Sequence, residues 1–334
     1  PILTPRQSIP ELAVAQTVLV DVTASIHDGS ADPSRLRAIV TRRFREIGFA
    51  VVTDADQNHD VAVVIACRET EPAARRPGQT GEDGFRMGER SFMGPPCLLT
   101  YVYGGQSMPW QWVDRIVFSL GVEAARRAEK KGSGVAPMDT FARYLEEYDY
   151  PLLLTAEWGQ TVRLRALLEN ARTDLERKRT IISLLGEVRA AEAVNCLLLA
   201  LEDDALVEPA AHALGNFGRQ VREPLVRLLR SSQRPEVQAA AARSLGNIGA
   251  STGDWSLSPL FVEILERPDL DIAVQIELVW ALGKNPDRRS LPALERLYNR
   301  VWSIKSDDPQ HDELRRAVDW SHRGVRLGGH TDEY

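Results

Sequence analysis

Cysteine is scarce in this sequence, with only Cys67, Cys97 and Cys196 among 334 residues. Their spacing contains no CxxC, no CxxCH and no zinc-ligand pattern, which excludes the common metal-cluster and c-type haem sites. Cys67 closes one apolar run and Cys97 opens another, so the two sulfurs would meet if these segments paired as antiparallel strands. We therefore expect either a Cys67–Cys97 disulfide, in an oxidising compartment, or small buried thiols.

Long apolar runs are missing as well. The most apolar stretch of the N-terminal half, residues 61–67, has the length of a β-strand. A helix needs ~20 apolar residues to span a bilayer, so we expect no transmembrane segment. The chain begins at Pro1 rather than Met, and we expect it to be processed or trimmed. Removal of a signal peptide would indicate a periplasmic location, and otherwise we expect a cytoplasmic one.

The sequence also lacks an excess of positive charge. Its formal net charge is −6, and the excess of acidic residues lies after residue 145. Nucleic-acid binding depends largely on clustered Lys and Arg. The charge balance therefore argues against a nucleic-acid partner, although net charge does not fix how the charges are distributed.

Motifs of catalysis and metal binding are absent from the sequence. The six histidines form no HxH or HExxH pair, which argues against a metal site. Residues 104–108, Gly-Gly-Gln-Ser-Met, do not match the GxSxG nucleophile elbow, and we interpret them as a turn. We predict no catalytic residue, no metal site and no cofactor, and therefore a protein that is not an enzyme.

Residues 1–134 are predicted to form a small α+β domain. The pair Asp32-Pro33, followed by apolar residues at helical spacing, predicts a helix that stops at Gly48. Runs of branched residues predict strands around it. The expected order is β-α-β-β-β-α: a strand at 16–24, the helix after 33, strands at 49–53, 61–67 and 97–103, and a helix from about 109. This order favours an antiparallel-rich sheet with two helices on one face.

A long loop interrupts this predicted domain at residues 68–96. It is rich in Gly, Pro and charge and contains few large apolar residues. Loops of this length inside a compact domain are usually either disordered or functional. We expect disorder or an arm that becomes ordered on a partner, with Arg86 and Phe92 as its contact residues.

Internal repetition is the strongest pattern in the sequence. A Leu-Gly pair follows an apolar-periodic helix about every 30 residues, as expected of a solenoid. The pairs are Leu185-Gly186, Leu214-Gly215, Leu245-Gly246 and Leu282-Gly283, and later helices open at Pro224, Pro259 and Pro292. We interpret each glycine as a left-handed turn and each proline as the start of a second helix. The third repeat carries an insertion at residues 251–256.

These segments resemble the short HEAT-like repeats of the phycobilisome-lyase type, over roughly residues 175–298. The resemblance implies that residues 135–334 form an all-α solenoid with helical caps. It also implies a curved superhelix whose concave surface consists of the second helices and contacts proteins. A minority of HEAT-like proteins are enzymes, namely bilin lyases and a group of DNA glycosylases, but no residue motif of either transfers to this sequence.

The predicted function is that of a protein-protein interaction scaffold or accessory subunit of a multiprotein assembly. The contact residues are expected on the second helices, the inserted turn and the 68–96 loop: Arg86, Phe92, Arg222, Arg227, Arg230, Trp255, Glu263 and Arg296. Trp280, on the apolar face of a repeat, is expected in the core. The alternative is a lyase-like or chaperone-like protein that acts on a cofactor-bearing protein partner.

Overall fold

The computed structural model describes residues 9–25, 33–68, 97–108, 142–143 and 145–327. The chain divides into two compact units, Pro1–Gln160 and Thr161–Tyr334. In the described residues, every helix is too short or too polar to cross a membrane. The predicted 68–96 loop and the predicted helix from about residue 109 lie outside the described residues.

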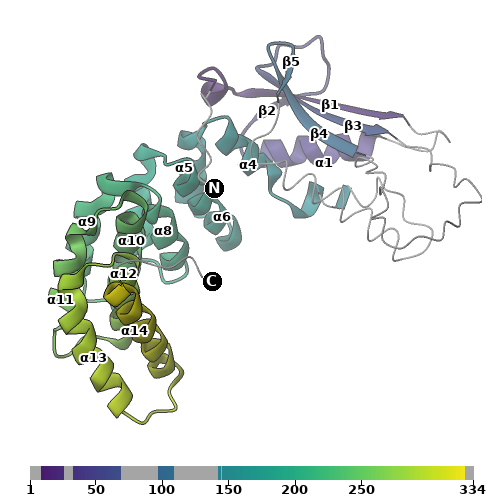
Figure 1. The fold of residues 1–334 in the computed structure, drawn as a ribbon. Helices are drawn as coiled ribbons and strands as arrows, with labels where there is room; N and C mark the ends of the chain where they lie inside the picture. The colour runs from purple at the N-terminus through teal and green to yellow at the C-terminus, as the bar shows by residue number, and fades with distance from the viewer. Residues whose placement is uncertain (1–8, 26–32, 69–96, 109–141, 144, 328–334) are drawn as a thin grey trace, which may run out of the picture. The chain divides into compact units, whose positions relative to one another are not determined.

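The N-terminal unit contains a five-stranded mixed sheet in the order β2-β1-β3-β4-β5 (Figure 1). Its strands are β1 Thr17–Ser25, β2 Ala50–Val52, β3 Val61–Arg68, β4 Cys97–Tyr103 and β5 Gln106–Met108. The predicted α+β class is confirmed, but the expectation of an antiparallel-rich sheet is wrong. Strand β1 runs parallel to both β2 and β3, while β3–β4 and β4–β5 are antiparallel. Helix α1 connects β1 to β2, and such a crossover returns the chain in the same direction.

Glycine ends two elements of this unit as the sequence indicated. Helix α1, Pro33–Glu46, buries Leu36 and Phe44 on its apolar side. Gly48 follows it at φ +87°, the left-handed conformation of a helix stop. Gly104 and Gly105, at φ +57° and +77°, form the predicted turn, which connects β4 to the short strand β5.

An aromatic cluster joins α1 to the last helix of the unit, α4, Tyr150–Glu157. The rings of Phe44 and Trp158 stack at 6.2 Å between centroids, and Tyr101 of β4 meets Trp158 edge-on at 5.8 Å. The side chain of Gln160 donates to the carbonyls of Leu12 and Ala15, at 2.8 and 2.9 Å. The compact N-terminal unit therefore extends to Gln160, whereas the predicted domain boundary at 134/135 falls among residues outside the described ranges.

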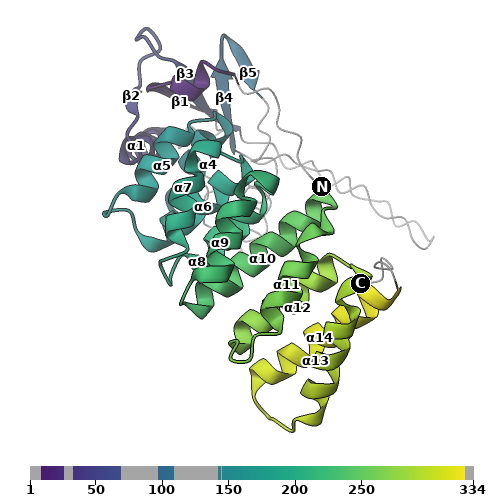
Figure 2. The ribbon, with the colours of Figure 1, turned by 90° about the vertical axis from the view of Figure 1, so that its left-hand side faces the viewer.

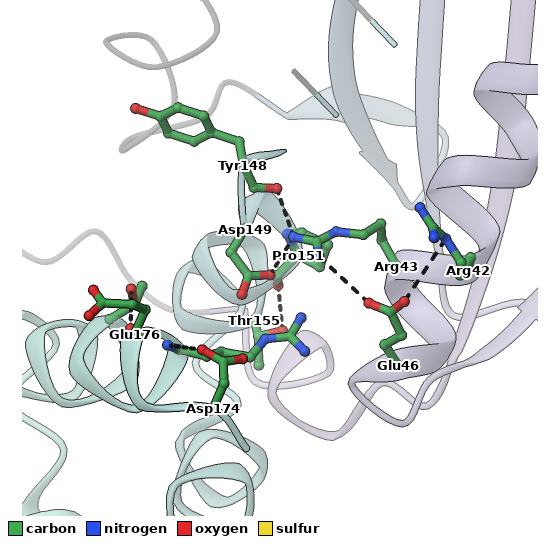
Figure 3. A network of polar contacts seen from close by, with 11 residues as sticks. Arg42, Arg43, Glu46, Tyr148, Asp149, Pro151, Thr155, Asp174 and Glu176 are labelled. Atoms are coloured by element: carbon green, nitrogen blue, oxygen red, sulfur yellow. Dashed lines mark hydrogen bonds and ion pairs between the residues drawn. The ribbon is translucent and has the colours of Figure 1, made fainter. Parts of the chain in front are cut away.

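A polar network connects the same two helices (Figure 3). Arg43 of α1 donates to the carbonyl of Tyr148 and to the carboxylate of Asp149, both at 2.9 Å. Glu46 lies 3.6 Å from Arg43 and 3.9 Å from Arg42. This network fixes the start of α4 against α1, so we assign it a structural role.

The C-terminal unit is a run of ten α-helices over its described residues, 161–327 (Figure 2). Each Leu-Gly pair of the sequence lies in what we call a first helix, and the helix that follows is a second helix. The first helices are α6 Leu175–Glu187, α8 Val207–Gly215, α10 Pro235–Thr252 and α12 Ile272–Lys284. The second helices are α7 Val194–Ala200, α9 Arg222–Ser231, α11 Ser258–Leu265 and α13 Leu291–Ser303. Helix α5, Thr161–Glu169, precedes them, and α14, Pro309–Leu327, follows.

The repeat glycines do not have the turn role that we expected. Gly186, Gly215, Gly246 and Gly283 lie inside the first helices, and none has a positive φ. A Cβ added at Gly186 would lie 2.5 Å from the Cα of Ala213 in the next first helix. At Gly246 it would lie 2.8 Å from the Cβ of Ala281. The missing side chain therefore lets successive first helices approach each other closely.

This packing distinguishes two rows of helices. The first helices pack directly on one another from α6 to α12, and α14 continues the row. Each second helix packs on the first helix that follows it, and successive second helices have little backbone contact within residues 161–327. The first helices are therefore in closer contact with one another than the second helices are. A concave surface formed by the second helices stays a prediction.

Candidate protein-binding surfaces

Most of the predicted contact residues on the second helices form ion pairs from repeat to repeat. Arg230 of α9 lies 3.1 Å from Glu263 of α11, and both side chains are about half exposed. Arg296 of α13 pairs with Glu266, which follows α11. Exposed pairs of this kind contribute ~0–1 kcal/mol each. The structure thus brings Arg230 and Glu263 together as partners of each other.

Arg227 differs from these residues. It is exposed on α9, and among the described residues its guanidinium has neither a hydrogen-bond nor an ion-pair partner. Arg86 and Phe92, the predicted contact residues of the 68–96 loop, lie outside the described residues. Among the predicted contact arginines on the second helices, Arg227 is therefore the one whose charge is free to bind a partner protein.

The insertion in the third repeat lengthens a helix instead of making a loop. Helix α10 runs through Thr252 and ends at Gly253, which has φ +64°. Asp254 then accepts a hydrogen bond from the backbone N–H of Ser256 at 3.1 Å. Arg222 of α9 donates to the same carboxylate at 3.1 Å. Hydrogen bonds from Ser256, with a smaller effect of Arg222, hold the pKa of Asp254 below its usual value.

Trp255 is held in place by this arrangement. It opens the short 3-10 helix Trp255–Leu257, directly after the fixed Asp254. The residue is 45% exposed, although Leu257 of the same turn is buried. An aromatic side chain presented on a fixed backbone loses little conformational freedom when it binds. Tryptophan is also among the residues that dominate binding energy at protein interfaces.

The first-helix row contains a network of polar contacts that sequence reasoning did not find. Arg243 of α10 pairs with Glu208 of α8 and, at 2.6 Å, with Glu277 of α12. The two carboxylates raise the pKa of Arg243 above its usual value, first of all through the hydrogen bond that Arg243 donates to Glu277. The buried hydroxyl of Ser244 donates to the carbonyl of Ala211 at 2.8 Å. Arg243 thus connects three successive first helices.

Trp280 does not lie in the core, so our expectation for it is wrong. It is half-buried at the surface of α12 and packs on Trp320 of α14, with ring centroids 5.1 Å apart. The sequence suggested a core position because Trp280 lies among apolar residues of its helix. Trp320 went unnoticed because α14 carries no Leu-Gly pair. The sequence held one signal for the contact between Trp280 and Trp320: α14 follows α12 at the spacing expected of a further repeat.

A further exposed tryptophan, Trp302 of α13, is partly covered by its neighbours. The guanidinium of Arg315 lies 5.8 Å from the centre of its ring, and Tyr298 lies 6.0 Å away. This contact is a cation–π interaction, worth ~0.5–1 kcal/mol at an exposed site. Trp302 therefore stabilises the connection between α13 and α14.

The described residues contain no group of three or more His, Cys, Asp and Glu side chains that could hold a metal ion. His322 lies 3.9 Å from Glu295 as a single pair. The antiparallel register sets Cys67 directly opposite Cys97. Cys67 is buried and disulfide-bonded, and Cys196 is free. That Cys97 is the residue bonded to Cys67 stays our prediction.

The repeated helix pairs and their close first-helix row define an α-solenoid. A comparison with known families finds HEAT repeats, matched at residues 162–246 and 222–306. Residues 162–306 thus contain HEAT repeats, as the sequence resemblance implied for the C-terminal half. HEAT repeats typically mediate protein interactions, because their stacked helices present extended binding surfaces. No curated protein matches the chain.

Proposed function

We propose that this protein is a non-catalytic scaffold or accessory subunit that binds a protein partner in a larger assembly through its HEAT repeats. The observation that carries this proposal is the fixed and exposed Trp255. Trp255 is 45% exposed on a turn held by Asp254 and Arg222. A large apolar side chain presented in this way stabilises the free protein little and a complex much more.

The charges around Trp255 fit the rim of such a contact. Arg219 lies 3.5 Å from Asp254, which also binds Arg222, so two cations flank one carboxylate beside the tryptophan. The guanidinium of Arg227, on the following turn of α9, has no partner among the described residues. Binding interfaces commonly combine an aromatic centre with a polar rim. We therefore assign Trp255 the central role and Arg227 a place in the rim.

The test is a cross-linking pull-down of the full tagged chain from its native cells, read by mass spectrometry. We expect a protein recovered in stoichiometric amount, with cross-links to α9 and the α10–α11 turn. Trp255→Ala should lower its recovery about ten-fold or more, which corresponds to ~1.4 kcal/mol or above.

Leu199→Ala is the matched control. Leu199 is even more exposed than Trp255, at 72%, but lies on α7, away from this turn. Recovery with the control should equal that of the wild-type chain. The proposal fails if the chain is recovered alone, or if Trp255→Ala and Leu199→Ala retain the same partner equally. A visible chromophore bound to or transferred by the purified chain would instead support a lyase-like protein.

A further inference from the structure

The tryptophan pair of the first-helix row forms an open aromatic platform. The ring planes of Trp280 and Trp320 meet at 57°, and both side chains are half-buried, so part of each ring faces solvent. Gly283 makes the arrangement possible, because a Cβ there would lie 2.4 Å from Cζ3 of Trp320. The indole of Trp320 thus lies on the backbone of α12, which runs beside α14 (Figure 1).

Lys284 lies next to this platform and forms no ion pair with a described carboxylate. It follows Gly283 and is one helical turn from Trp280, so its stem lies on the same face of α12. Its ammonium donates to Oδ1 of Asn247 at 2.8 Å, and none of the described carboxylates forms an ion pair with it. An ammonium has three N–H donors, so two remain for a ligand.

The neighbouring cation on the first-helix row differs from Lys284 in its carboxylate partners. Arg243 has two carboxylate partners, Glu208 and Glu277. Lys284 is half-buried, and burial lowers its pKa, although Glu277 opposes this effect. A partly desolvated cation with no carboxylate at ion-pair distance destabilises the free protein. An incoming carboxylate would remove that cost, which gives the site a preference for an anionic group.

We propose that Trp280, Lys284 and Trp320 bind a peptide segment of a partner protein in which a carboxylate stands next to an aromatic or large aliphatic side chain. The apolar side chain packs on the two indoles, and the carboxylate accepts hydrogen bonds from Lys284. This inference rests on the proposed scaffold function and names a second contact, on the other row of helices from Trp255.

The surrounding charges favour a single carboxylate over a polyanion. Glu277 and Asp319 lie on the same two helices, close to the platform in sequence, and both are already paired with arginines, at 2.6 and 2.7 Å. A nucleic-acid strand would bring a series of phosphates against these carboxylates. A short peptide brings one negative charge to the unpaired cation and an apolar group to the rings, which matches the groups that are present.

A selection from a displayed random peptide library on the immobilised full chain tests this site. We expect the enriched peptides to carry Asp or Glu within two residues of Phe, Tyr, Trp, Leu or Ile. An enriched peptide is then labelled with fluorescein and titrated by anisotropy. Lys284→Gln should weaken its binding about ten-fold or more, as expected for the loss of a charge-assisted hydrogen bond, and Lys284→Arg should weaken it less.

Lys305→Gln is the control, because Lys305 is an exposed lysine in the α13–α14 connection, outside the platform. Trp280→Leu tests the apolar part of the site. It avoids Trp320, where a substitution would disturb the close packing on Gly283. It should weaken binding, with circular dichroism unchanged. The proposal is overturned if no peptide is enriched, if the enriched peptides lack an acid, or if Lys284→Gln binds as well as Lys305→Gln.

The two proposals can fail separately. Suppose that a stoichiometric partner is lost with Trp255→Ala, but its peptides bind Lys284→Gln as well as the wild-type chain. The scaffold function is then supported and the Trp280–Lys284–Trp320 site is disproved. If peptide binding depends on Lys284 but the chain is recovered alone from cells, the peptide site is supported and the scaffold function is disproved. Displacement of the bound peptide by oligothymidylate at equal charge concentration would assign the platform to single-stranded nucleic acid instead and overturn the peptide proposal.

Discussion

The two units of this protein are stabilised in different ways. In the N-terminal unit, distant parts of the chain meet in one core, as Phe44 of α1 meets Trp158 at the end of α4. In the repeat array, most contacts join residues about one repeat apart, as in the pair Arg243–Glu277. A change in the first unit should therefore affect the whole of it, whereas a change in the array should act mainly on neighbouring repeats.

The largest effect is expected from reduction of the predicted Cys67–Cys97 disulfide. It would close a loop of ~30 residues between β3 and β4, and its loss should destabilise the N-terminal unit by about 3 kcal/mol. Hydrogen exchange followed by mass spectrometry measures this in the full chain. Amides of β3 should exchange faster after reduction, while those of α10 stay unchanged. Peptide mapping without reductant that finds both cysteines as free thiols would contradict the prediction.

Gly186→Ala should be the next most damaging change, and it should act within the array. The new Cβ would lie 2.5 Å from the backbone of Ala213, so α6 and α8 would have to separate, at a cost of ~2–3 kcal/mol. Gly215→Ala is the matched control. Its Cβ would approach only the side chain of Asn247, at 3.3 Å. Urea unfolding should show a lower midpoint for Gly186→Ala alone, and equal midpoints would disprove the close-approach role.

The two rows of helices should differ in the strength of their ion pairs. Arg243→Ala leaves Glu277 nearly buried, at 12% exposure of its side chain, without its ion-pair partner, and should destabilise the array by about 2 kcal/mol. Arg230→Ala breaks an exposed pair and should cost less than ~1 kcal/mol. Both are measured by chemical unfolding in low and high salt. Similar losses for the two variants would show that the rows are equivalent.

The smallest expected effect is a gain of stability. Lys284 has a pKa below its ordinary value of 10.5, mainly through burial, so the unfolded chain holds this proton more tightly. The lysine therefore destabilises the fold at neutral pH, and the penalty disappears as the pH rises through the lowered pKa to the ordinary one. Lys284→Met should raise the melting temperature slightly at pH 7 and not above pH 10.5. A lower melting temperature at pH 7 would mean that Lys284 stabilises the free protein.

Sequence reasoning was most successful where the signal is local. The turn at Gly104–Gly105, the helix stop at Gly48 and the positions of the strands follow from a few neighbouring residues. It failed where the partner is distant. The parallel pairing of β1 with β3 depends on the crossover through α1. The partners of Arg230 and Arg243 lie 33 to 35 residues away, so no pattern within one helix reveals them.

The sequence by itself determined that residues 162–306 form HEAT repeats, because a repeated apolar pattern leaves each helix pair with a face that only the next pair can cover. Only the tertiary structure decided what the repeated residues do. The glycines serve close helix contact, Arg230 and Glu263 neutralise each other, and Trp280 meets Trp320 at the surface. The reason is physical: a residue's role in a solenoid depends on the side chain that the neighbouring repeat places opposite it.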